Sequence, residues 1–309
     1  MGMFFAKGEK PMSTCSVRRE NGITVVEAVG KDGLAGYPGV VCTNPDAPPE
    51  ERIFRKEFKN PDKHIYLAHE YDLAVRTELA DHYRFVVAMN GYTSLTNDQC
   101  AAWGVKPGAY EKACSVLLTQ VDEHVRRHFP DACSCYVHGA SDMGVDKVIS
   151  ETATRLRRRQ LGFSCPEYLF YVPDNDVPVY VAASVDEYSD SFVRTSDILI
   201  AANGRLQAFR MDIAAVFTHD KFLLPVNVLK LISTNGGPPA KGADGKINDA
   251  VAHFEQRFFA IGTQVYGLKG RDAWSAAIAE AQDIVAHICR HILEPEVGLE
   301  IHGHPGQTA

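Results

Sequence analysis

Short apolar runs alternate with amphipathic helical patterns through most of the chain. Mainly apolar runs at 85–89, 133–137, 168–172, 197–202 and 222–228 predict strands, and the continuous apolar run at 85–89 is typical of a strand buried on both faces. Between them, apolar residues recur three or four positions apart, most clearly over 110–125, and this spacing predicts helices. Strands that alternate with helices are typical of an α/β fold with a layered, mainly parallel sheet.

The two ends of the chain have different patterns. Residues 1–60 are irregular except for a β-rich run at 23–29 after the turn signal Asn21-Gly22, so we expect an N-terminal arm with a short β hairpin. Residues 61–293 form the α/β domain, including C-terminal helices at 250–262 and 273–293. The polar residues 294–309 predict a mobile tail. The Gly- and Pro-rich stretch 235–248 predicts a loop long enough to cover a site.

The composition narrows the class of protein. Hydrophobic residues make up 45% and charged residues 23% of the 309 residues, as in ordinary globular proteins. The formal charge of −7 argues against nucleic-acid binding through a broad basic surface, but it does not exclude a local basic groove. No apolar run is long enough for a membrane span, and we expect a cytoplasmic protein. The N-terminal arm is a candidate for contacts in a homodimer.

The eight cysteines do not predict a disulfide framework. The chain is long, lacks a signal-like apolar segment and shows no metal-ligand spacing of cysteines or histidines. We therefore expect reduced thiols, no bound metal and no cofactor.

Residues 133–159 combine a strand, a turn with Gly139 and Gly144, and a helix. The free N–H groups of a helix start and the close approach that glycine permits make such a turn a candidate phosphate site, with Ser141 as a hydroxyl donor. Alternatively, the glycines simply make a tight turn. Asp146 lies in the first helical turn, where it either complements the helix dipole or accepts hydrogen bonds from a ribose.

Polar turns follow several predicted strands, and in open α/β sheets ligands bind at the carboxyl ends of the strands. The turn at 90–94 offers Gly91 and Ser94, and the turn at 203–212 offers Gly204 and Arg205 as phosphate ligands. Candidate catalytic residues in these turns and in the one at 182–188 are Asp212, Arg210 and Asp186. Solvated helix faces are the alternative interpretation of these charged residues.

Two of these stretches resemble a known superfamily. HGASDMGVD at 138–146 is similar to the Gly-Gly-Ala-x-Gly-x-Asp signature of the LOG-like, or SLOG, superfamily, and SDILIAANGRLQA at 196–208 resembles its second signature. The superfamily includes lonely-guy phosphoribohydrolases, molybdenum-cofactor carrier-like proteins and the DNA-processing A family. The resemblance covers about residues 84–229. It implies a Rossmann-like three-layer fold and a nucleotide or phosphosugar ligand.

The sequence departs from the lonely-guy motif Pro-Gly-Gly-x-Gly-Thr-x-x-Glu. Its turn has the single glycine Gly204, Arg210 stands in the place of the glutamate, and the nearest acid is Asp212. Two hypotheses therefore remain. The protein hydrolyses or transfers an N-glycosidic bond, or it is a non-catalytic nucleotide sensor or carrier. Single-stranded DNA binding is a third hypothesis, which the acidic charge opposes.

Overall fold

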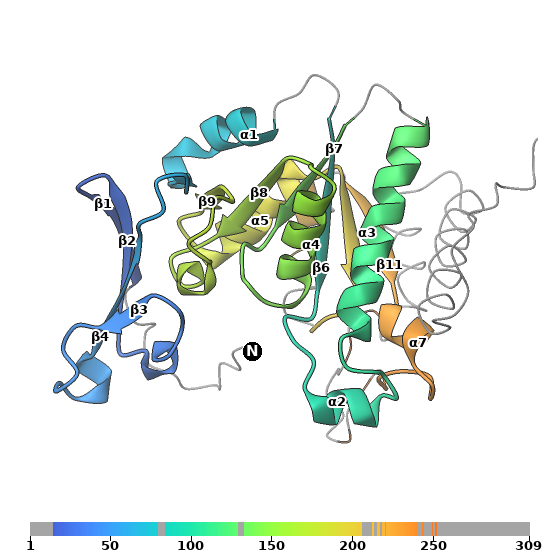
Figure 1. Cartoon of the computed structure of the whole chain (residues 1–309), viewed down its shortest axis with the longest axis horizontal. Coiled ribbons are helices and arrows are strands. Elements are labelled where there is room, and N and C mark those ends of the chain that lie inside the picture. The colour runs from blue at the N-terminus through green and yellow to red at the C-terminus, as the bar shows by residue number, and fades with distance from the viewer. Residues whose placement is uncertain are drawn as a thin grey trace, which may run out of the picture.

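A seven-stranded parallel sheet forms the centre of the protein (Figure 1). The computed structural model describes residues 15–79, 84–128, 133–205, 212, 215, 216, 218, 219, 221–239, 241, 243, 249 and 251. The sheet order is β11-β10-β6-β7-β8-β9-β5, and every adjacent pair is parallel. Its strands are β5 (Ile65–Tyr66), β6 (Arg84–Gly91), β7 (Cys133–His138), β8 (Gln160–Ser164), β9 (Val179–Val181), β10 (Ile198–Ala202) and β11 (Phe222–Val226).

Helices cover both faces of this sheet. The helices α3 (Ala109–His128) and α4 (Gly144–Arg155) lie on one face, and α1 (Tyr71–Leu79) and α5 (Val185–Thr195) lie on the other. Along β6, Val87 and Met89 pack in the first core while Val86 and Ala88 pack in the second. Both sets of side chains are buried, which explains the continuous apolar run and confirms the predicted three-layer α/β fold.

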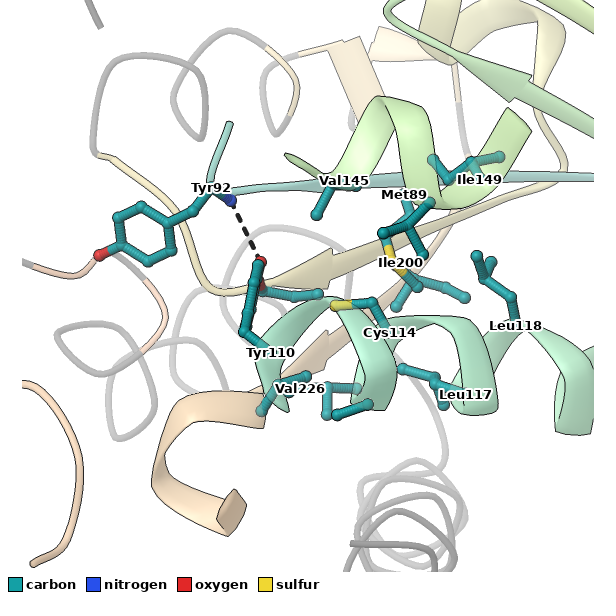
Figure 2. Packing of buried hydrophobic residues seen from close by; sticks show 14 of the residues in the cluster. Met89, Tyr92, Tyr110, Cys114, Leu117, Leu118, Val145, Ile149, Ile200 and Val226 are labelled. Atoms are coloured by element: carbon teal, nitrogen blue, oxygen red, sulfur yellow. Dashed lines mark hydrogen bonds between the residues drawn. The ribbon is translucent and has the colours of Figure 1, made fainter. Parts of the chain in front are cut away.

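The core beneath α3 reaches the carboxyl ends of the central strands. Figure 2 shows Tyr110, Cys114 and Leu118 of α3 packed near Met89 and Ile200 of the sheet. The Tyr110 hydroxyl accepts a hydrogen bond from the backbone N–H of Tyr92 at 3.1 Å and donates one to the Ala202 carbonyl. Tyr110 therefore connects the residue that follows β6 to the last residue of β10 through hydrogen bonds.

The N-terminal region forms a second sheet, larger than the short hairpin expected. Its antiparallel strands are β1 (Cys15–Glu20), β2 (Ile23–Val29), β3 (Val40–Cys42) and β4 (Ile53–Phe58), in the order β1-β2-β4-β3. The predicted Asn21-Gly22 turn joins β1 to β2, because Glu20 pairs with Ile23. One face packs on the end of the parallel sheet, with Val26 and Phe54 in a core that also contains Val179.

The predicted strand at 168–172 is wrong. These residues contain a 3-10 helix, η4 (Leu169–Tyr171), and the strand in this part of the sheet is β8. The backbone N–H groups of Tyr168 and Leu169 both donate to the Cys165 carbonyl, which closes a turn directly after β8. The side chains of Leu169 and Phe170 are buried beneath the N-terminal sheet, so the apolar run reflects burial and not a strand.

Other differences from the predicted elements are small. Two helices, α2 (Asn97–Ala102) and α7 (Val228–Ile232), and the short strand β5 were not predicted. The strand expected at 222–228 ends at Val226, because the Asn227 side chain caps the first turn of α7. Short 3-10 helices lie at η1 (Asp32–Leu34), η2 (Pro49–Glu51) and η3 (Ala68–Glu70).

Several predictions lie outside the described residues. They include the tail at 294–309, the helix at 273–293, the helix at 250–262 apart from Val251, and half of the loop at 235–248. Among the described residues, six cysteines form no disulfide bond, namely Cys15, Cys42, Cys100, Cys114, Cys135 and Cys165. None of the helices described there combines the length and the apolar character needed to cross a membrane.

Candidate functional site

The candidate site lies where the chain order of the sheet reverses. From β6 the chain continues through β7, β8 and β9 on one side and then returns to β10 on the other side of β6. Neighbouring carboxyl ends of β6 and β10 are held in register by the pairing of Ala201 with Asn90 and of Ala202 with Gly91. Such a switch point is the usual ligand crevice of an open α/β sheet.

Asp212 is held at this switch point by two side chains. Its Oδ2 accepts a hydrogen bond from Asn90 Nδ2 at 2.8 Å, and its Oδ1 accepts one from Ser189 Oγ at 2.7 Å. The residue is 6% exposed. Burial raises the pKa of the Asp212 carboxyl to about 6, the two hydrogen bonds oppose this shift, and the nearby charge of Asp146 adds to it. The sequence had marked Asp212, and the fold gives it a perturbed environment.

Asp146, in the first turn of α4, closes back onto the glycine turn. Its Oδ1 accepts from the Gly139 backbone N–H at 2.8 Å, and its Oδ2 accepts from Ser141 Oγ at 2.7 Å. Burial raises the pKa of the Asp146 carboxyl and these bonds oppose that effect. The donors that the sequence predicted for a phosphate thus contact a carboxylate of the protein in this structure.

Gly91 and Gly144 allow the loop after β6 to pack on the start of α4. Gly144 has φ +48°, and a Cβ atom there would overlap the Tyr92 carbonyl oxygen. At Gly91, a Cβ atom would overlap the Tyr110 hydroxyl and lie 2.6 Å from Val145 Cγ2. The backbone N–H of Val145 donates to the Tyr92 carbonyl at 3.2 Å. Both glycines are therefore required by close packing between these two segments.

Tyr188 lies near the two carboxylates and contacts a second tyrosine, Tyr168. Burial raises the pKa of Tyr188, and the charges of Asp146 and Asp212 raise it further. The Tyr168 ring lies edge-on to the Tyr188 ring, with centroids 5.9 Å apart, and Tyr168 is 38% exposed. Sequence reasoning missed Tyr168 because it lies in the run that was predicted to be a strand.

A second buried network fixes the turn after β10. Asn203 has φ +65°, and its Nδ2 donates to Asp249 and to Asn227 Oδ1. The fully buried Asp249 also accepts from the Tyr92 hydroxyl at 2.9 Å. Gly204 follows with φ +118° and lies against the backbone of Gly91. Asp249 was missed because no local pattern separates it from the polar loop before it.

The other predicted site residues that the structure describes, Arg205, Ser94 and Asp186, are exposed. Arg205 is exposed, and its charge lowers the pKa of the nearby Tyr92 against the larger effect of burial. Ser94 is exposed before α2, and Asp186 is exposed in the first turn of α5. Within the described segments, neither shares a hydrogen bond with Asp146 or Asp212. Arg210 lies outside the described residues.

His138 is a buried, hydrogen-bonded histidine. Its Nδ1 accepts from the Ala140 backbone N–H at 3.1 Å, so Nε2 carries the proton and donates to Gln160 Oε1 at 3.2 Å. Burial lowers its pKa to about 4, which keeps the ring neutral at physiological pH. The ring supports the positive φ of Ala140 in the glycine turn. Over the part of the chain that is described, no group of three or more His, Cys, Asp or Glu residues could hold a metal ion.

Comparisons with known proteins find distant structural likeness. No family model matches the sequence, and no curated protein matches it. The structural genomics target TM1055 is 15% identical, covers 50% of this chain and 76% of its own, and has a TM-score of 0.34. The molybdenum cofactor carrier protein from Chlamydomonas reinhardtii is 11% identical, covers 46% of this chain and 76% of its own, and has a TM-score of 0.31.

Proposed function

We propose that the protein binds a nucleotide or ribosyl phosphate at the carboxyl ends of β6 and β10 and hydrolyses or transfers its N-glycosidic bond. The observation that carries the proposal is the environment of Asp212. A carboxyl with a pKa of about 6 is mostly ionised at neutral pH but remains within reach of a proton. Such a group can stabilise the oxocarbenium-like centre that forms as the base leaves, attack that centre, or activate a water molecule.

The neighbours of Asp212 fix its orientation for this role. Asn90 and Ser189 each occupy one carboxylate oxygen, and each oxygen keeps a second lone pair for a sugar hydroxyl or a water. The Asn90 Oδ1 atom is buried and has no hydrogen-bond partner among the described residues, so it can accept from a ligand donor. Asp146 can accept a hydrogen bond from a ribose hydroxyl. Asp186 and Arg210 are the other candidate catalytic residues.

The phosphate of the ligand is assigned to the turn at Gly204 and Arg205. A phosphate on Gly139 and Ser141 would first have to displace the Asp146 carboxylate, which carries the same sign of charge. The turn after β10 combines a glycine with an exposed arginine, which suits a phosphate at the protein surface. Gly144, Gly91 and Ser94 then shape the crevice beside it.

The test is release of free base from nucleosides and nucleoside 5′-monophosphates, followed by chromatography. We expect release by the wild type, a loss of about 100-fold or more in Asp212→Asn, and no change in Asp98→Asn, which removes an exposed acid of α2. The rate should rise with pH through about 6, as Asp212 ionises. If the folded protein releases no free base from any of these substrates, the proposed enzymatic activity is wrong.

A second candidate function is a non-catalytic sensor or carrier that uses the same crevice. All four carboxylate oxygens of Asp146 and Asp212 accept a hydrogen bond from the protein, as in a satisfied structural network. This function predicts that a nucleotide raises the melting temperature without being consumed, because it binds the native state. Thermal unfolding with each nucleotide, beside the base-release assay, separates the two functions.

A further inference from the structure

The segment 165–173 runs between the N-terminal sheet and the candidate site. It follows β8 directly and takes the place that a crossover helix would fill before β9. On the site side it presents Tyr168, whose ring contacts the ring of Tyr188. Tyr188 is close enough to Asp146 and Asp212 for their charges to raise its pKa, so Tyr168, which is 38% exposed, is linked to the candidate site through its contact with Tyr188.

Three successive backbone carbonyls of this segment are held from two directions. Lys56 Nζ donates to the Phe170 carbonyl at 2.9 Å and to the Val172 carbonyl at 2.6 Å. Between them, the Tyr171 carbonyl accepts from the backbone N–H of Asp142 at 3.3 Å. Lys56 belongs to β4 of the N-terminal sheet, and Asp142 belongs to the glycine turn. The segment is thus clamped between these two parts of the molecule.

Lysine is a costly residue at such a position. Lys56 is 4% exposed, and burial disfavours its charged form. Its ammonium group lies 5.4 Å from the centre of the Phe58 ring and finds its hydrogen-bond acceptors on the segment. The carbonyls of a buried segment that pairs with no strand need donors, and Lys56 supplies two of them.

We propose that Lys56 is a positioning residue, through which the N-terminal sheet holds Tyr168 as the aromatic wall against which the base of the ligand stacks. In this proposal the N-terminal sheet contributes to the binding site through Lys56 and is not an independent structural element. The identification of the stacked group as a base rests on the proposed function. The clamp, meaning the hydrogen bonds that hold the segment 165–173, does not depend on that function. An aromatic ring of this kind stacks on any base and discriminates against a ligand that lacks one.

The first measurement is hydrogen exchange on the full chain, read by mass spectrometry. Lys56→Met keeps the apolar stem and removes both hydrogen bonds, so exchange at 165–173 should accelerate about tenfold while β6 and β7 stay protected. Arg55→Met is the matched control. Arg55 is the preceding residue of β4, and its side chain pairs with Glu20, Glu27 and Glu57. Unchanged exchange at 165–173 in Lys56→Met overturns the proposal.

The second measurement compares ligands with and without a base, namely the common ribonucleoside 5′-monophosphates and ribose 5-phosphate. Lys56→Met and Tyr168→Leu should each weaken nucleotide binding about tenfold and leave ribose 5-phosphate unchanged, whereas Arg55→Met should change neither. Equal losses for both ligands overturn the positioning role, because a merely structural defect would not separate them. If the wild type binds none of these ligands, the proposed function fails, and the exchange experiment still decides the clamp. If Lys56→Met does not fold, Lys56→Gln takes its place in both measurements. Its side chain is one bond shorter and uncharged, so changes in the same direction but of smaller size are expected, and no change overturns the proposal.

Discussion

The side-chain amide of Asn90 donates to the carboxylate of Asp212 at 2.8 Å across the switch point of the sheet. The bond joins the end of β6 to Asp212, which follows β10 in the chain, over a separation of 122 residues. It uses the amide nitrogen of Asn90 and leaves the buried amide oxygen without a protein partner among the described residues. The pair therefore combines a perturbed acid with an unused acceptor at the place where ligands bind in such folds.

Asp212→Asn should stabilise the protein increasingly as the pH rises. Because the pKa of Asp212 is raised from 3.8 to about 6 on folding, the native state favours the protonated acid, and stability is lost as the pH rises through this range. Asparagine removes this dependence, and the amide of Asn90 can turn so that its oxygen accepts from the new side chain. The advantage of the variant should grow by about 1 kcal/mol between pH 5 and pH 8 in urea unfolding.

The control for this experiment is Asp98→Asn, which changes an exposed acid in the first turn of α2. Its effect on the free energy of unfolding should stay nearly constant over the same pH range. An advantage of Asp212→Asn that is the same at pH 5 and pH 8 would show that burial does not raise the pKa of Asp212.

Gly144→Ala should be much more destabilising than Gly108→Ala. Both glycines have positive φ, +48° and +76°, and alanine is strained in either conformation. A Cβ atom at Gly108 meets nothing within 4 Å, whereas one at Gly144 overlaps the backbone of Tyr92 and Thr93. We expect a loss of about 1 kcal/mol at Gly108 and about 3 kcal/mol or more at Gly144. Urea unfolding of the two variants measures the difference, and equal losses would contradict the close packing of α4 on the loop after β6.

The central sheet could be predicted because its strands are buried on both faces. Val86 to Met89 must all be apolar when helices cover both sides, so the sequence pattern alone identifies β6. The same reasoning failed at Leu169 and Phe170, which are equally apolar but are buried under the N-terminal sheet. An apolar run reports burial, and it does not report which element is buried.

The sequence pattern can indicate which strand ends carry candidate site residues, but it cannot indicate the hydrogen bonds between them. The rule for strand ends located Gly139, Asp146 and Asp212, because it depends on chain order alone. The hydrogen bonds of Lys56 to Phe170 and Val172 span more than a hundred residues, and no local pattern marks them. Likewise, the occupation of Gly139 and Ser141 by Asp146 depends on a rotamer of one side chain, which spacing does not specify.

Arg158→Met should cost far more stability than Arg126→Met, although both arginines contact Asp122. Arg158 binds the buried carboxylate through two hydrogen bonds, from Nε at 2.8 Å and from Nη2 at 3.1 Å. Arg126 contacts it from a side chain that is 53% exposed. Loss of Arg158 strands a buried charge and should cost about 3 kcal/mol, whereas loss of a solvated partner should cost less than about 1 kcal/mol.

Chemical unfolding of both variants gives the comparison, and the double variant Asp122→Leu with Arg158→Met provides the control. The double variant removes both charges and should recover most of the stability that the single Arg158→Met change loses. If Arg158→Met unfolds at the same denaturant concentration as Arg126→Met, the Asp122–Arg158 pair does not anchor α3 to the turn before β8.

Lys63 should react with acylating reagents at neutral pH before other lysines do. It lines a cleft of about 140 Å³ beside the glycine turn, where Nζ donates to Asn175 Oδ1 at 3.1 Å and to the Val177 carbonyl at 2.7 Å. Burial lowers its pKa to about 7, Asp174 opposes this shift, and Lys56 adds to it. At pH 7.5 more than half of Lys63 is then a neutral, nucleophilic amine, compared with about 0.1% of an ordinary lysine.

Limited acetylation followed by peptide mass spectrometry measures the rate at each lysine as a function of pH. The rate at Lys63 should rise through pH 7 and level off above about pH 8, because the amine is then fully neutral. At Lys59, which is 71% exposed, access to the reagent is better, so any faster reaction of Lys63 at pH 7.5 reports its charge state. A rate at Lys63 that continues to rise up to pH 10 would show that the amine stays protonated in the cleft.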